Sequence, residues 1–153
     1  MMLNGVCIAT GLATLLAAAL VIAPSAEARS RKPFKGPVMA SVVQVIDGDT
    51  FLADAHIWPG QSIRINIRIR GIDAPEMKSR CRGERAAALR AQAALSGMIG
   101  EATVSISNIG GAKYYGRVLA DVETEAGEAV GTTLLDRQFV RPYSGGKRQG
   151  WCG

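Results

Sequence analysis

The sequence contains a single histidine, His56, and this scarcity limits the chemistry available to the chain. A zinc site built from several imidazoles needs more than one histidine, so that class of metal centre is excluded. One histidine would be enough for a Ser-His-Asp triad, but no serine lies in the G-x-S-x-G setting typical of such enzymes. We therefore assign His56 no function. No internal repeat is visible in the chain.

Residues 1–28 have no lysine or arginine, although the whole chain has 18 of these residues. Residues 5–22 form a continuous run of small and apolar residues, and Ala26-Glu27-Ala28 follows. This pattern predicts a secretory signal peptide in residues 1–28 with cleavage near Ala28. Because the run approaches the length of a membrane span, an uncleaved anchor is the alternative.

The charge of the remaining chain is strongly basic. Removal of residues 1–28 takes away only Glu27, which leaves 18 basic and 12 acidic residues and a net charge of +6. We expect an exported protein, periplasmic or secreted, with no membrane contact after cleavage of the signal. A basic exported protein of this size favours phosphate-rich partners.

Cysteine is also scarce, with three residues, of which Cys7 lies in the predicted signal peptide. In an oxidising compartment the remaining pair, Cys81 and Cys152, favours a disulfide, and two free thiols are the alternative. A metal site on these two cysteines lacks partners at suitable spacing. The disulfide would close a loop of roughly 70 residues and stabilise the fold by about 4 kcal/mol on the chain-entropy model.

The 153 residues are 48% apolar and 20% charged, which indicates one folded domain with a sizeable core. Residues 29–37 are basic, contain two prolines and have no periodicity, so we expect a flexible arm before a domain over residues 38–153. The most informative stretch is I-R-I-N-I-R-I-R-G-I-D-A-P-E, residues 63–76. Its strict alternation predicts a half-buried strand with four isoleucines on one face and arginines on the other.

The other segments predict a mainly β fold with helices. Asp47-Gly48 lies between apolar runs and indicates a hairpin of strands over residues 42–46 and 50–53, and a second turn over residues 58–61 leads into the isoleucine strand. We expect a helix over residues 84–99 with Ala88, Ala91, Leu95 and Met98 as its apolar stripe. Two further strands are expected over residues 103–109 and 115–122, a short helix over residues 130–137, and an irregular tail over residues 138–153. Three consecutive strands joined by short turns are the start of a small barrel.

Taken singly, the polar motifs have ordinary structural explanations. Asp-Gly-Asp-Thr can be a hairpin turn, and Asp-Ala-Pro-Glu can be the end of a strand. In the order V-x-V-I-D-G-D-T-F, R-x-x-x-x-D-A-P-E, helix, Y-G-R-V-L-A-D-V, however, the motifs together resemble the staphylococcal nuclease (thermonuclease) family. The resemblance covers about residues 42–143 and implies an OB-fold, a five-stranded barrel with two or three helices. The strand count above agrees with this independently.

The resemblance also implies a Ca²⁺ site in this chain. Asp49 and Asp73 match the family's calcium-binding carboxylates, and the backbone carbonyl of Ala74 matches a further ligand. Many family members have threonine at position 74, but a main-chain oxygen ligates equally well from alanine. Asp47 and Thr50 match the supporting acidic turn around the metal.

Further roles follow from the same resemblance. Glu76 matches the presumed general base, and Arg68 and Arg117 match the two arginines that bind the phosphate. Tyr115 matches a tyrosine that lines the nucleotide pocket, and Tyr143 corresponds to one that stacks on the base. The family's long C-terminal helix is shortened here and replaced by a glycine-rich tail that ends near Cys152.

The chemistry of these residue types is consistent with this assignment. Two carboxylates and a carbonyl suit a hard, oxygen-seeking ion, calcium more than zinc. Two guanidiniums can each donate paired hydrogen bonds to phosphate oxygens, and a carboxylate can accept a proton from water. We therefore expect a monomeric, calcium-dependent nuclease that cleaves DNA and RNA with little sequence preference, leaves a 3′-phosphate and a 5′-hydroxyl, and needs no stable protein partner. The alternative is a catalytically inactive OB-fold module that binds nucleic acid or a protein.

Overall fold

The structure is a computed structural model that describes residues 32–112 and 116–152. The expected signal peptide and the first residues of the basic arm lie outside the described residues. The described residues belong to one compact unit. In these two ranges no helix is long and apolar enough to cross a membrane.

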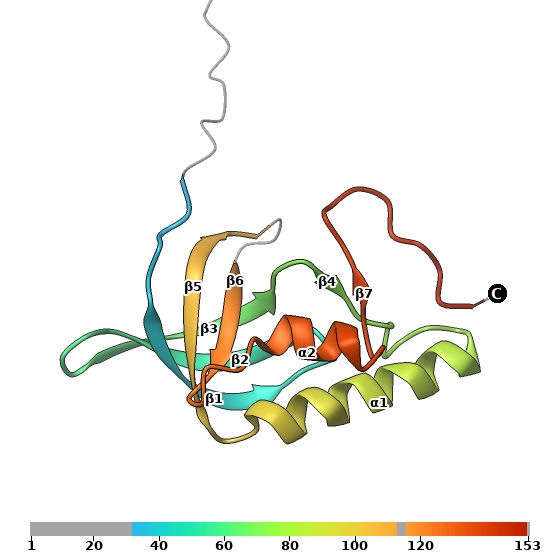
Figure 1. The fold of residues 1–153 in the computed structure, drawn as a ribbon, viewed down its shortest axis with the longest axis horizontal. Coiled ribbons are helices and arrows are strands. Elements are labelled where there is room, and N and C mark those ends of the chain that lie inside the picture. The colour runs from blue at the N-terminus through green and yellow to red at the C-terminus, as the bar shows by residue number, and fades with distance from the viewer. Residues whose placement is uncertain (1–31, 113–115, 153) are drawn as a thin grey trace, which may run out of the picture. The chain divides into compact units, whose positions relative to one another are not determined.

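Five strands close a barrel in the order β1-β2-β3-β6-β5 (Figure 1). All neighbouring pairs are antiparallel except β3 and β6, which are parallel. The expected mainly β fold with helices and a five-stranded, OB-like barrel is confirmed. The barrel strands are β1 (Val38–Val45), β2 (Thr50–Trp58), β3 (Gln61–Ile69), β5 (Thr103–Gly111) and β6 (Arg117–Thr124).

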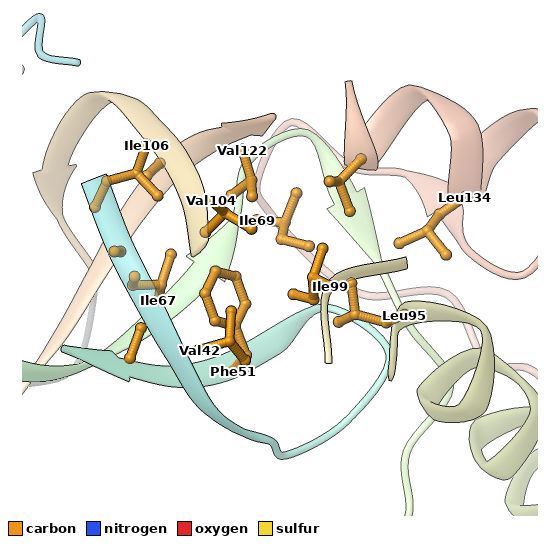
Figure 2. Packing of buried hydrophobic residues seen from close by; sticks show 14 of the residues in the cluster. Val42, Phe51, Ile67, Ile69, Leu95, Ile99, Val104, Ile106, Val122 and Leu134 are labelled. Atoms are coloured by element: carbon orange, nitrogen blue, oxygen red, sulfur yellow. The ribbon is translucent and has the colours of Figure 1, made fainter. Parts of the chain in front are cut away.

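The core lies inside the barrel, where alternate residues of each strand point inward. On β3 the inward residues Ile67 and Ile69 are almost completely buried, and Phe51 of β2 lies among them (Figure 2). Alanines fill the positions around this large ring on β1, β2 and β6. Small and large side chains therefore share the narrow interior, as the period-two pattern requires.

The isoleucine strand differs from the prediction at its first residue. Ile63 shares the face of Ile65, Ile67 and Ile69, but 47% of Ile63 is exposed. The β2–β3 hairpin extends beyond the barrel, because its tip residues Ile57 and Trp58 are also exposed. The inner wall of this strand is therefore formed by its second half, the half that leads to Asp73–Glu76.

Two helices lie side by side against the barrel, α1 (Arg82–Ile99) and α2 (Val130–Asp136) (Figure 1). The buried stripe of α1 is formed by Ala88, Ala91, Leu95 and Ile99. The sequence analysis placed Met98 in this stripe, but Met98 is only partly buried and Ile99 contributes to the core instead. Gly100 ends the helix, as expected.

The C-terminal tail is more ordered than predicted. Residues 141–142 form strand β7 (Arg141–Pro142), which pairs antiparallel with β4 (Ile72–Asp73). The expectation of an irregular tail over residues 138–153 is therefore wrong at this point. The N–H of Tyr143 extends this pairing by donating to the carbonyl of Gly71 at 2.8 Å.

A disulfide joins Cys81, just before α1, to Cys152 near the C-terminus. The Cα atoms are 6.4 Å apart, within the range that such a bridge spans. The geometry fits the predicted pairing of these two residues. The disulfide fixes the end of the tail beside the loop that follows Glu76.

Candidate active site

The acidic turn between β1 and β2 places Asp49 at the edge of the barrel. The N–H of Asp49 donates to a carboxylate oxygen of Asp47 at 3.0 Å, which stabilises the turn locally. The carbonyl of Asp49 accepts the N–H of Ile69 at 2.8 Å, so the turn is also fixed to the end of β3. The hydroxyl of Thr50 donates to the Asp49 carboxylate at 2.8 Å.

Gly48 allows this turn to approach its neighbours closely. A Cβ atom at position 48 would lie 2.6 Å from the Cβ of Ala91 in α1 and 2.9 Å from the Cβ of Ala74. Such distances do not occur between carbon atoms in contact, so a side chain would force the three segments apart. The small residues Gly48, Ala74 and Ala91 together bring the turn, α1 and the segment after β4 into contact.

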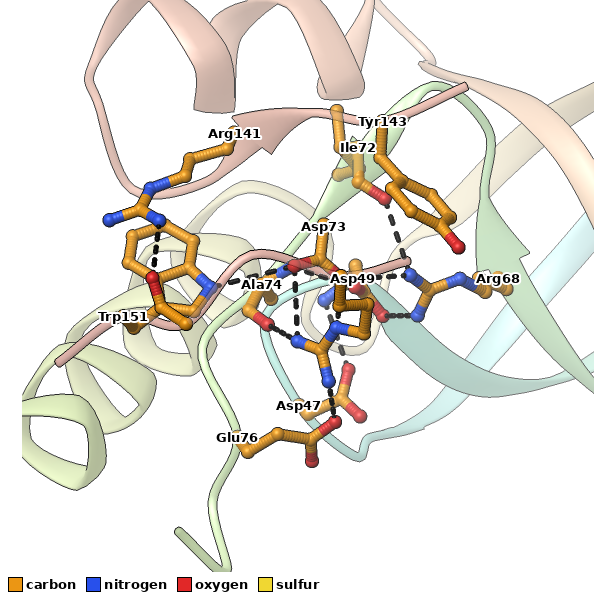
Figure 3. A network of polar contacts seen from close by, with 12 residues as sticks. Asp47, Asp49, Arg68, Ile72, Asp73, Ala74, Glu76, Arg141, Tyr143 and Trp151 are labelled. Atoms are coloured by element: carbon orange, nitrogen blue, oxygen red, sulfur yellow. Dashed lines mark hydrogen bonds and ion pairs between the residues drawn. The ribbon is translucent and has the colours of Figure 1, made fainter. Parts of the chain in front are cut away.

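Asp73, at the end of β4, lies beside Asp49 at this edge of the barrel, and we call this region the acidic corner. Both candidate carboxylates are buried. Asp49 is 2% exposed and Asp73 is 5% exposed. The N–H of Ala74 donates to the Asp49 carboxylate at 2.9 Å, which joins the two acidic segments directly (Figure 3). Buried carboxylates need compensating donors or cations, and this corner supplies both.

Arg68, the last arginine of β3, lies between the two acids. Its Nη1 donates to Asp49 at 2.5 Å, and its Nη2 lies 3.5 Å from Asp73 and 3.3 Å from the carbonyl of Ile72 (Figure 3). Its side chain is 21% exposed, so the guanidinium remains at the surface of the corner. Strand β3 therefore places the positive charge of Arg68 beside the carboxylates of Asp49 and Asp73.

Burial has a clear electrostatic effect on Asp49. Loss of hydration raises the pKa of Asp49 to about 6, and the negative charge of Asp47 acts in the same direction. The Arg68 guanidinium and the hydrogen bonds from Ala74 and Thr50 lower this pKa and limit the rise. The nearby positive charge of Arg68 therefore favours the ionised form of this buried carboxylate.

Glu76 lies beyond Pro75 on the loop that leads to α1, and its side chain is 59% exposed. Its backbone N–H donates to the carboxylate of Glu84 in α1 at 3.1 Å, and the hydroxyl of Ser79 donates to the same carboxylate at 2.6 Å. The Ser79 hydroxyl and the Glu76 N–H lower the pKa of Glu84. Glu84 therefore orders the loop that carries Glu76.

The sequence analysis did not place Arg148 in this corner. Its Nε lies 2.7 Å from one oxygen of Asp73, and its Nη2 donates to the other oxygen at 3.1 Å and to the carbonyl of Ala74 at 2.6 Å. Its Nη1 donates to the carboxylate of Glu76. Burial opposes the charge of this guanidinium, but the carboxylates of Asp73 and Glu76 hold its pKa above the usual value.

Trp151 is a second residue that the sequence analysis did not place in this corner. Its indole N–H lies 3.5 Å from Asp73, and the Arg141 guanidinium lies over its ring at 3.8 Å from the centroid. The predicted disulfide was the available signal for both residues. Cys81 follows Glu76 closely in the sequence and Cys152 follows Arg148 closely, so the bridge brings these two short stretches together.

Of the three remaining candidate residues, two lie within the described part of the chain. Arg117 begins β6, and its Cα pairs with that of Asn66, two residues before Arg68 on the same outer face of β3. Tyr143 follows β7 and lies beside Ile72 at the border of the corner (Figure 3). Tyr115 lies outside the described residues.

The oxygen atoms of the corner can be compared with the ligands that a divalent cation requires. Among residues 32–112 and 116–152, no group of three or more histidine, cysteine, aspartate or glutamate side chains is arranged to hold a metal ion. The corner offers the carboxylates of Asp49 and Asp73 and the carbonyl of Ala74, and this carbonyl and Asp73 already hold the Arg148 cation. Oxygen donors that bind a guanidinium also suit a hard cation, so the residues fit calcium chemically, and the calcium site remains a prediction. Comparison of the sequence with known protein families and with functionally described proteins gives no match.

Proposed function

We propose that this chain is an exported, calcium-dependent nuclease that hydrolyses the phosphodiester bonds of DNA and RNA by water attack, with little sequence preference. One observation carries the proposal. Asp49 of the hairpin turn, Arg68 of β3, and the pair Asp73 and Glu76 come from three separate segments, and all four lie in one corner at the edge of the barrel. The resemblance to the staphylococcal nuclease family supports the same activity.

The residues of the corner complement one another chemically. A phosphodiester resists attack because its anionic oxygens repel a nucleophile, and the five-coordinate transition state concentrates negative charge further. When bound at Asp49, Asp73 and the Ala74 carbonyl, a divalent cation would neutralise a phosphate oxygen and lower the pKa of water. Arg68 and Arg117 donate paired hydrogen bonds to the phosphate from neighbouring strands.

Glu76 accepts the proton of the attacking water in this proposal. Its exposed carboxylate lies on the solvent side of the buried acids, where water reaches it, and Glu84 holds the backbone of its loop. No serine, cysteine or histidine nucleophile is required, which agrees with a chain that has one histidine.

A second candidate function is a binding module without catalysis. The observation that favours it is the Arg148 guanidinium, which donates to the carboxylates of both Asp73 and Glu76 and offsets their charge. A basic surface around a neutralised corner would bind phosphate groups without hydrolysing them.

Digestion of single-stranded DNA separates the two functions. The purified protein is incubated with end-labelled DNA in calcium and in a chelator, beside the variant Glu76→Gln and the control Glu125→Gln, an exposed glutamate on the loop after β6. We expect calcium-dependent cleavage with 3′-phosphate ends in the wild type and in the control, and loss of most cleavage in Glu76→Gln. DNA binding without cleavage in any divalent cation would support the binding module instead.

A further inference from the structure

The C-terminal segment, residues 143–152, delivers a positive charge into the candidate cation site. The Arg148 guanidinium contacts both oxygens of Asp73, the carbonyl of Ala74 and the carboxylate of Glu76. Two of the three predicted calcium ligands and the predicted general base are thus engaged by one side chain of the same molecule. The third predicted ligand, Asp49, pairs with the Arg68 guanidinium instead.

The segment that carries Arg148 is attached at both ends. At its start the β4–β7 pairing and the Tyr143 N–H hold it to the barrel. At its end the disulfide fixes Cys152 to Cys81. Between these points Arg141 donates to the carbonyl of Gly150 at 2.9 Å, and the Tyr143 hydroxyl donates to the carbonyl of Gly146 at 2.8 Å.

A tethered guanidinium and a free divalent cation compete for the same oxygens. Two positive charges repel strongly at the separation of neighbouring ligands, so both cannot contact Asp73 and Ala74 together. Tethering raises the effective concentration of Arg148 at the site to about the millimolar range or above. The apparent dissociation constant of the cation then rises in inverse proportion to the fraction of molecules in which Arg148 is out of the site.

We propose that the C-terminal segment is an autoinhibitory latch in which Arg148 occupies the cation site until a divalent cation or cleavage of the Cys81–Cys152 disulfide displaces it. This inference rests on the proposed function for its consequence, because displacement of Arg148 also frees Glu76 to accept a proton. The latch itself concerns only the competition between Arg148 and the cation.

The disulfide makes the latch sensitive to thiols. A dithiol reductant supplies two electrons and two protons, which convert the S–S bond into the thiols of Cys81 and Cys152, and the reductant becomes a cyclic disulfide. The segment then keeps its covalent connection only through β7, so Arg148 leaves the site more often. Reduction therefore raises the affinity for the cation without changing any ligand.

Calcium titration by calorimetry without nucleic acid tests the latch directly. The proteins are the oxidised wild type, Arg148→Ala, Arg148→Gln as a second variant that keeps a polar side chain, and the control Lys147→Ala. Lys147 is the neighbouring cation, and within the described residues it makes no hydrogen bond or ion pair. We expect both Arg148 variants to bind calcium at least tenfold more tightly, about 1.4 kcal/mol, and the control to stay within twofold of the wild type.

The tether is tested by the double variant Cys81→Ser/Cys152→Ser and by the wild type in a dithiol. Both should bind calcium with an affinity between those of the oxidised wild type and Arg148→Ala. Hydrogen exchange of residues 144–151 in the wild type should become faster when calcium is added. This readout needs no variant and does not depend on cleavage.

The outcomes separate the latch from the nuclease. Tighter calcium binding by Arg148→Ala with no DNA cleavage supports the latch and contradicts the nuclease. Equal or weaker calcium binding by both Arg148 variants, with cleavage intact, overturns the latch alone. Absence of calcium binding in every protein overturns the latch and the predicted metal site together, and unchanged affinity after reduction overturns the role of the disulfide.

Discussion

At the scale of single residues, the corner depends on the hydrogen bonds that the Asp49 carboxylate accepts. Its carboxylate accepts hydrogen bonds from Thr50, Ala74 and Arg68, which come from three separate segments. A residue with this many partners reports on the position of all of them. The acids and Arg68 could be proposed from the sequence, because their motifs in this order resemble those of the staphylococcal nuclease family.

Replacement of Arg68 by lysine tests whether geometry matters beyond charge. Lysine keeps the charge but cannot donate two parallel hydrogen bonds to a phosphate. We expect Arg68→Lys to lower the cleavage rate on the order of 100- to 1,000-fold, the range found when one electrostatic donor is removed from a transition state. The measurement is the initial rate of DNA cleavage at saturating calcium.

Arg64 offers a matched control on the same strand. Its guanidinium pairs with Asp54 at 2.9 Å at the surface, away from the acidic corner. Arg64→Lys should keep the wild-type rate within about twofold, since exposed ion pairs contribute little. Equal rates for Arg68→Lys and the wild type would contradict the paired hydrogen bonds.

At the scale of elements, the site depends on three segments that pack closely because only small residues lie between them. The hairpin turn, α1 and the end of β4 meet at Gly48, Ala91 and Ala74. The sequence predicted the turn and the helix correctly from local patterns. It did not predict their contact, because close approach depends on the curvature of the barrel rather than on any local period.

Gly48→Ala tests this contact. The added methyl group would clash with two neighbouring Cβ atoms, so we expect a loss of about 1–3 kcal/mol in the free energy of unfolding. Urea unfolding measures the change. Cleavage should also fall, because the clash displaces Asp47 and Asp49.

Gly97→Ala is the matching control. Gly97 lies in α1, and no atom lies within 4 Å of the position that a Cβ would take. Alanine favours the helix over glycine, so this variant should be more stable by about 0.5–1 kcal/mol. If Gly48→Ala were stabilised to the same extent, the close packing at the turn would be wrong.

At the scale of the whole molecule, the disulfide determines what the C-terminus can reach. The two cysteines are 71 residues apart, yet their bridge places Arg148 and Trp151 at the candidate site. The barrel strands and the succession of the first three could be predicted from alternation and turn chemistry, and the five-stranded barrel from the family resemblance. The role of the tail could not, because it depends on a covalent contact between distant segments and on the two-residue strand β7, which is too short for a periodic pattern.

Removal of the bridge tests its contribution to the fold. On the chain-entropy model, a closed loop of this length stabilises by about 4 kcal/mol. Cys81→Ser/Cys152→Ser should therefore lower the free energy of unfolding by roughly that amount in urea, and a dithiol should have no further effect on the variant. A wild-type protein that shows two free thiols without reductant would contradict the bridge.

The central claim is that the acidic corner uses a divalent cation to hydrolyse phosphodiesters, and the calcium dependence of DNA cleavage tests it most directly. The account predicts that cleavage by the wild type rises with free calcium to a plateau and stops in a chelator. It predicts that Asp49→Asn needs at least tenfold more calcium to reach half of its own maximum rate. Cleavage that is equally fast in the chelator, or an unchanged calcium requirement in Asp49→Asn, would contradict the account.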